Sequence, residues 1–262
     1  MPKRPMQVPP LPTAFLQAPI AHRALHDRSQ GRPENSREAI AAAMAAGYGI
    51  EIDLQLSADG AAMVFHDYAL ERLTGQTGAI RQSRAAELGQ ITLTGGASPI
   101  PRFTEVLALV AGRVPLLVEI KDQDGALGPG IGQLEAAAAR DAAGYGGPLA
   151  FMSFNPHSVR VLSGLAPDIP RGIVTSAYRP KDWMLVPAAT RVRLRGIPDI
   201  DGAGAAFISH EAEDLARPRV AEIRARGLPV LCWTIRSPEQ EAEARKYADN
   251  VTFEGYAAAL SG

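Results

Sequence analysis

Acidic side chains stand in this sequence where buried strands are expected. Glu51 and Asp53 lie in the apolar run 49–54, and Glu119 and Lys121 end the run that begins at residue 116. Because residues two apart in a strand share a face, each pair should point in one direction. Buried carboxylates without a cation are costly. We therefore expect an oxygen-ligated metal held by Glu51, Asp53 and Glu119.

Two histidines accompany these acids. His22 closes the apolar stretch 20–22, and the Asp-Gly pair within residues 57–60 predicts a hairpin that brings His66 back toward the first two acids. Two histidines beside one site can act as base and acid. Hard oxygen ligands favour Mg²⁺ or Ca²⁺ over zinc.

An anionic substrate needs its own cations. Arg23 follows the first histidine and Lys121 follows Glu119 by two positions. Arginine and lysine are the usual partners of phosphate groups, so we expect both to hold a substrate anion.

Each of these features also has a structural interpretation. The pair Glu51 and Asp53 could face solvent on an edge strand, Glu119 and Lys121 could form a surface ion pair, and a single histidine at a strand end is more often structural. The apolar residues that alternate with the acids favour the functional interpretation, because they predict buried strands.

The elements that must position these residues alternate between strands and helices. Eight strand-then-helix units in this length predict a (β/α)₈ barrel, which places its active site at the carboxyl ends of the strands. An open doubly wound sheet is the alternative, but no glycine-rich phosphate loop follows the first strand. The predicted strands are residues 20–22, 49–54, 116–120, 149–153, 172–175, 205–209, 230–234 and 250–253. The predicted helices include residues 36–46, 103–111, 132–143, 156–165, 218–226 and 238–247.

Two stretches interrupt this alternation. Residues 67–101 are expected to be a small insertion after the strand-2 hairpin, with a short helix near 84–88. Residues 177–204, which include Arg191, Arg193 and Arg195, are expected to be an irregular surface loop. Long loops in compact domains are often functional. The whole chain, residues 1–262, is interpreted as one barrel domain.

Composition excludes several classes of function. The 262 residues include 27 basic and 28 acidic side chains, for a net charge of −1, so no overall positive field would recruit nucleic acid. Cys232 is the only cysteine, which excludes an internal disulfide and a cysteine-rich zinc site. No apolar run reaches the length of a membrane span, and prolines interrupt the first 19 residues where a signal peptide would need an apolar segment. We expect a cytoplasmic enzyme without a stable membrane anchor; the sequence leaves the oligomeric state open.

Five short motifs occur in a fixed order along the chain. Together with similar residues between and after them, they cover most of the chain, and they resemble the glycerophosphodiester phosphodiesterase family. The family pattern runs His-Arg-Gly, Pro-Glu-Asn-Thr, Glu-Leu-Asp-Val, Phe-His-Asp and Glu-Ile-Lys. Its counterparts here are His22-Arg23-Ala24, Pro33-Glu34-Asn35-Ser36, Glu51-Ile52-Asp53-Leu54, Phe65-His66-Asp67 and Glu119-Ile120-Lys121.

The resemblance implies a TIM-barrel enzyme that hydrolyses glycerophosphodiesters to an alcohol and glycerol 3-phosphate with a divalent metal. It implies that Glu34 and Asn35 bind the substrate directly or orient the site, with Asp67 in support, and that Trp233 forms a wall near the glycerol end. A buried barrel aromatic is an equal alternative for Trp233. Two departures stand out: Ala24 replaces a glycine, and Glu254 follows the last strand where the family usually has a Thr-Asp pair.

Two rival functions follow from the same residues. A phospholipase similar to sphingomyelinase D could use this barrel, although those relatives lack the Pro-Glu-Asn-Thr string. A non-catalytic phosphate-binding barrel would be expected to lack one acid or histidine, and none is missing. In every case the expected partner is a small phosphodiester, and the sequence does not identify its alcohol.

Overall fold

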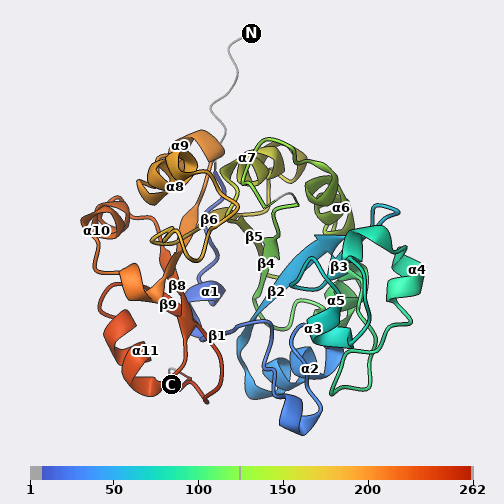
Figure 1. The fold of residues 1–262 in the computed structure, drawn as a ribbon. Helices are drawn as coiled ribbons and strands as arrows, with labels where there is room; N and C mark the ends of the chain where they lie inside the picture. The colour runs from blue at the N-terminus through green and yellow to red at the C-terminus, as the bar shows by residue number, and fades with distance from the viewer. Residues whose placement is uncertain (1–7, 124, 261–262) are drawn as a thin grey trace.

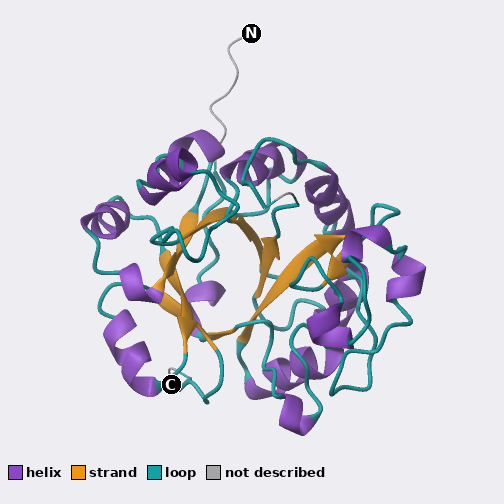
Figure 2. Ribbon diagram, viewed as in Figure 1, coloured by secondary structure: helices purple, strands orange, loops and turns teal. Residues whose placement is uncertain are grey.

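Eight parallel strands form a closed barrel in the computed structural model, which describes residues 8–123 and 125–260. Figure 1 shows the ring of strands with helices around it, and Figure 2 separates the two kinds of element by colour. Closure comes from β1, which pairs with both β2 and β9. The barrel strands are β1 (Ile20–Ala21), β2 (Gly49–Leu56), β4 (Leu116–Ile120), β5 (Leu149–Ser153), β6 (Arg171–Thr175), β7 (Phe207–Glu211), β8 (Val230–Ile235) and β9 (Asn250–Phe253). The predicted (β/α)₈ barrel is therefore confirmed.

Helices follow the first seven barrel strands and pack on the outside of the ring. They are α2 (Arg37–Ala46), α5 (Phe103–Val110), α6 (Gln133–Asp141), α7 (Pro156–Leu165), α8 (Ala188–Arg195), α9 (Ile200–Ala203), α10 (Pro218–Ala225) and α11 (Pro238–Ala244). Two single 3₁₀ turns, η1 (Arg28–Gln30) and η3 (Ala212–Asp214), lie in the connections. Among the described residues, no helix is both long and apolar enough to cross a bilayer.

Alternation along the strands divides the core into two layers. Ile50, Ile52 and Leu54 of β2 face outward into the apolar layer between barrel and helices. The intervening Glu51 and Asp53 consequently face the interior of the barrel. An apolar cluster also lies inside the barrel. It includes Phe15 of α1 (Ala14–Gln17), the short helix before β1.

The predicted hairpin is present. β3 (Ala62–Val64) pairs antiparallel with the end of β2, Leu54 opposite Val64, and the Phe65 backbone N–H donates to the carbonyl of Asp53 at 3.0 Å. The insertion that follows contains α3 (Glu71–Thr74), η2 (Ile80–Gln82) and α4 (Ala85–Leu88), and it has an apolar cluster of its own. In Figure 1 these elements lie beside β3, outside the ring.

The prediction for residues 177–204 was wrong in part. This stretch contains the helices α8 and α9 rather than only loop. The sequence did not reveal α8 because it buries only Leu194 and therefore lacks the apolar stripe by which a surface helix is recognised. Strand β7 also begins two residues later than predicted.

Candidate active site

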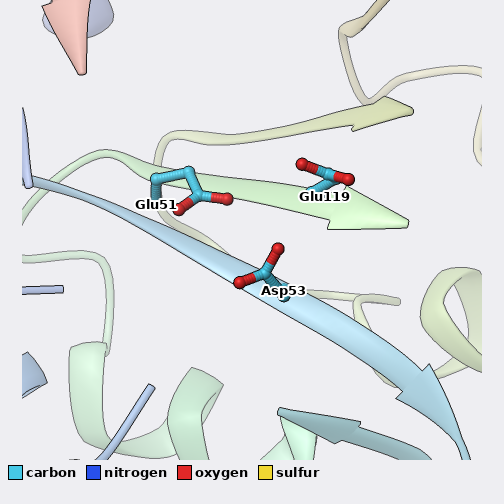
Figure 3. Close-up of side chains that lie close together, drawn as sticks. All are labelled: Glu51, Asp53 and Glu119. Carbon is cyan, nitrogen blue, oxygen red and sulfur yellow. The ribbon is translucent and has the colours of Figure 1, made fainter. Parts of the chain in front are cut away.

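Three carboxylates meet inside the barrel on two adjacent strands. β2 supplies Glu51 and Asp53 and β4 supplies Glu119, with Asp53 directly opposite Glu119 in the parallel register. One oxygen from each carboxylate lies within 4.8 Å of the others, and all three side chains are buried (Figure 3). The predicted trio is therefore brought together by the fold.

Positive charge compensates these acids unevenly. Lys121 Nζ lies 2.9 Å from Glu119 Oε1 and 3.3 Å from Asp53 Oδ1. Burial acts to raise the pKa of Asp53, but Lys121, the strongest of the nearby cations, lowers it well below its usual range. Burial likewise acts to lower the pKa of Lys121, and the two carboxylates raise it above its ordinary value instead.

Glu51 lacks such a partner. Its carboxylate accepts a hydrogen bond from the backbone N–H of Arg23 at 2.8 Å, and no cationic side chain of the described residues forms an ion pair with it. Burial, followed by repulsion from Asp53 and Glu119, raises its pKa well above the ordinary value. A divalent cation fits this donor set, because it would supply the charge that the three buried carboxylates lack.

An unusual turn directs the Arg23 N–H at Glu51. Arg23 and Ala24 have φ values of 50° and 64°, in the left-handed region that costs a non-glycine residue about 1–2 kcal/mol. Ala24 thus adopts the conformation that glycine would adopt more easily, and the replacement leaves the turn in place.

Each histidine is held by a carboxylate at the same ring nitrogen. His22 Nδ1 lies 2.6 Å from Glu254 Oε2, and His66 Nδ1 lies 2.7 Å from Asp67 Oδ1. Burial outweighs the Glu254 hydrogen bond and lowers the pKa of His22, so the neutral ring is favoured. With Nδ1 occupied, Nε2 is the nitrogen left for proton transfer in each ring.

Both histidines line one cavity with the acids. Its volume is about 170 Å³, and its wall also includes Arg23, Lys121 and Trp233. Trp233 stands at its apolar side, where its indole N–H donates to the Ser209 carbonyl at 3.1 Å. The predicted catalytic, phosphate-binding and metal-ligating residues therefore share one cavity.

Glu34 and Asn35 lie behind the cavity wall. Asn35 is buried and donates to Asp53 Oδ2 at 3.0 Å, which orients that carboxylate. Glu34 accepts from Arg23 at 2.9 Å and from both terminal nitrogens of Arg72. These contacts position the site residues and do not line the cavity.

The sequence matches the model of the glycerophosphoryl diester phosphodiesterase family over residues 22–251. The chain belongs to this family. It is accordingly a phosphodiesterase, and hydrolysis of glycerophosphodiesters is the activity of the family.

Individual relatives agree with the family match. A glycerophosphodiester phosphodiesterase of Caldanaerobacter subterraneus is 30% identical over 172 residues, covering 63% of this chain and 69% of the relative. The solved structure of an Oleispira antarctica phosphodiesterase in complex with the product sn-glycerol-3-phosphate is 26% identical, with a TM-score of 0.74 over 92% of this chain and 94% of that one. A Thermotoga maritima glycerophosphodiester phosphodiesterase, 22% identical with a TM-score of 0.68 over 90% of this chain and 94% of that one, shares the fold.

The sequence interpretation missed several residues of this site. One is Arg236, which lines the cavity and donates to Glu254 Oε1 at 2.8 Å. Glu254, noticed there only as a departure from the family pattern, is the partner of His22. Its position directly after β9 was the available signal, since His22 and Lys121 also directly follow barrel strands. Phe154, directly after β5, lines the cavity beside Trp233, with ring centroids 5.5 Å apart.

Proposed function

We propose that this glycerophosphodiester phosphodiesterase is metal-dependent, and that Glu51, Asp53 and Glu119 hold a divalent cation, Mg²⁺ or Ca²⁺. When bound, that cation would supply positive charge to the phosphate and stabilise the charge that develops there. The observation that supports the proposal is the trio of buried carboxylates in one cavity with two carboxylate-held histidines. The products are an alcohol and glycerol 3-phosphate.

Arg23 and Lys121 bind the non-bridging oxygens of the phosphate in this proposal. Their guanidinium and ammonium groups stand beside the acids, and each is already fixed by a carboxylate at one side. Fixed donors aimed at a reacting phosphate need little reorganisation during the reaction. Trp233 bounds the position of the glycerol.

His22 acts as the base and His66 as the acid. His22 Nε2 removes a proton from the nucleophile, which is water or a neighbouring hydroxyl of the substrate. The nucleophile oxygen then bonds to phosphorus, the bond from phosphorus to the leaving alcohol breaks, and His66 gives its proton to that alcohol. If a substrate hydroxyl attacks, water opens the cyclic phosphate in a second step with the two histidines reversed.

Turnover of a panel of glycerophosphodiesters, followed by release of the alcohol, tests this function. We expect EDTA to abolish turnover and added Mg²⁺ or Ca²⁺ to restore it. His22→Ala and His66→Ala should each lower kcat by at least about a hundredfold. His157→Ala on α7 is the matched control, because that histidine does not line the cavity.

The outcome that would contradict the proposal differs for each part. Turnover that is indifferent to chelation would remove the metal, and near-normal kcat in either active-site variant would remove the role of that histidine. The cytoplasmic location and the single-domain organisation remain predictions.

A further inference from the structure

A second cavity opens directly from the first. Its volume is about 650 Å³, nearly four times that of the first cavity. His66, Glu119, Lys121 and Phe154 line both. A ligand whose phosphate lies at the acids can therefore extend into the second cavity without leaving the protein surface.

Apolar side chains make up much of the wall of this second cavity. The segment between β6 and α8 contributes Trp183, Met184, Leu185 and Val186, and Leu127 comes from the segment after β4. Met184 is 83% exposed and Leu185 is 77% exposed. Two large apolar side chains so exposed at the edge of a cavity are typical of a surface that a ligand covers.

Aromatic packing holds this segment in place. The ring of Trp183 lies 4.9 Å from Phe154 and 5.0 Å from Tyr178, centroid to centroid, and Val186 is buried in a cluster with Leu127. Phe154 in turn contacts Trp233 in the first cavity. A continuous aromatic wall therefore connects the two cavities and positions the exposed pair at its far end.

Two of the acids that line the second cavity make other contacts, and Asp182, which also lines it, is exposed to solvent. Asp67 binds His66 and Arg72. Asp122 accepts from the side chain of Asn155 at 2.8 Å and from the backbone N–H of Leu127 at 3.0 Å. The free lining is thus mainly apolar, which favours a hydrocarbon group over a second charged group.

We propose that the second cavity binds an apolar chain carried by the leaving alcohol of the substrate. This inference rests on the proposed function, in which His66 protonates that alcohol. His66 borders both cavities, whereas His22 borders only the first. The leaving alcohol on the His66 side therefore points into the apolar cavity, and the glycerol phosphate stays in the small cavity beside Trp233.

A substrate series with one variable chain tests this assignment. Glycerophospho-N-acylethanolamines with acetyl, hexanoyl and decanoyl groups are compared by kcat/KM, with metal present and below the concentrations at which they aggregate. Each buried methylene contributes about fourfold to binding, so burial of only three predicts about a sixtyfold rise from acetyl to decanoyl.

A variant at the exposed end of the wall locates the effect. Leu185→Glu should lower the decanoyl-to-acetyl ratio at least tenfold and leave kcat/KM for the acetyl substrate within about twofold of the native value. Leu165→Glu on α7 is the matched control, since Leu165 is also exposed and does not line this cavity. We expect its ratio to equal that of the native chain.

Three results would overturn the inference. If the acetyl substrate is hydrolysed but kcat/KM does not depend on chain length, the apolar subsite is rejected and the proposed function stands. The same conclusion follows if kcat/KM depends on chain length and Leu185→Glu does not reduce that dependence. A dependence seen only when the decanoyl chain is on the glycerol, as in a lysophosphatidylethanolamine, would reject the leaving-alcohol assignment. Failure to hydrolyse any of these diesters would reject the proposed function and this inference together.

Discussion

The contact between His22 and Glu254 leads to a quantitative prediction for Glu254→Gln. The Nδ1 to Oε2 distance is 2.6 Å, and the two side chains are only 15% and 19% exposed, so solvent screens the pair weakly. When His22 takes a proton, it becomes a cation beside this carboxylate. Glutamine keeps the shape of the side chain and removes the charge.

The size of the effect follows from that one interaction. A hydrogen bond to a charged group contributes about 1.5–3 kcal/mol. The carboxylate already accepts from the neutral ring, but its attraction to His22 is strongest once the ring carries the proton, so the loss falls mainly on the transition state rather than on substrate binding. At about 1.4 kcal/mol per tenfold change in rate, kcat should fall by about ten- to a hundredfold with little change in KM.

Steady-state release of ethanolamine from glycerophosphoethanolamine measures this change. Glu239→Gln, at an exposed acid in the first turn of α11, removes the same charge away from the cavity and should keep native turnover. Both variants should retain the native far-UV circular dichroism spectrum. A kcat for folded Glu254→Gln within twofold of the native value would refute the role given to this pair.

Three further predictions concern stability. Glu51→Gln removes a buried carboxyl group whose pKa is raised, so it should raise Tm in EDTA. It should also abolish the stabilisation that Mg²⁺ or Ca²⁺ gives the native protein, about 2.7 kcal/mol in the free energy of unfolding when the metal is at a hundred times its Kd. An unchanged response of Tm to metal would contradict this. Ser36→Ala removes the N-cap of α2 and should cost about 1 kcal/mol in denaturant unfolding, whereas no loss would show that the cap is replaced. Arg72 helps to lower the pKa of Glu34 and Asp67 against the opposing effect of burial. The stability that depends on these ionised carboxylates is present above their ordinary pKa of about 4 and is lost as the pH falls below it. The difference in Tm between the native protein and Arg72→Met should therefore be large at pH 7 and become smaller toward pH 3. A Tm difference that does not change with pH would refute this prediction.

Family membership does not by itself give the substrate. The first cavity is small, and apart from Arg236 its charged side chains belong to the family pattern, whereas the adjoining apolar cavity takes five of its lining residues from residues 182–186. These residues lie in a stretch without a readable motif. Specificity for the alcohol is therefore expected to depend on the least predictable part of the chain.

The sequence by itself determined the barrel and the residues of its charged centre. Strand periodicity is local, because alternate side chains face opposite sides of a strand, and the acids stand out against their apolar neighbours. Glu51, Asp53 and Glu119 could be grouped from one rule, that parallel barrel strands end on the same face. The Asp-Gly hairpin added His66 by an equally local signal.

Only the tertiary structure decided which residues support that centre and which surface adjoins it. Glu254 reaches His22 across 232 positions, and the pairing depends on closure of the barrel between β1 and β9. Arg72 of the insertion reaches Glu34 for a similar reason. The apolar cavity requires two connecting segments to pack against one aromatic wall, and no periodic pattern encodes such packing between distant segments. Contacts of this kind depend on the geometry of the folded chain, which local residue preferences do not specify.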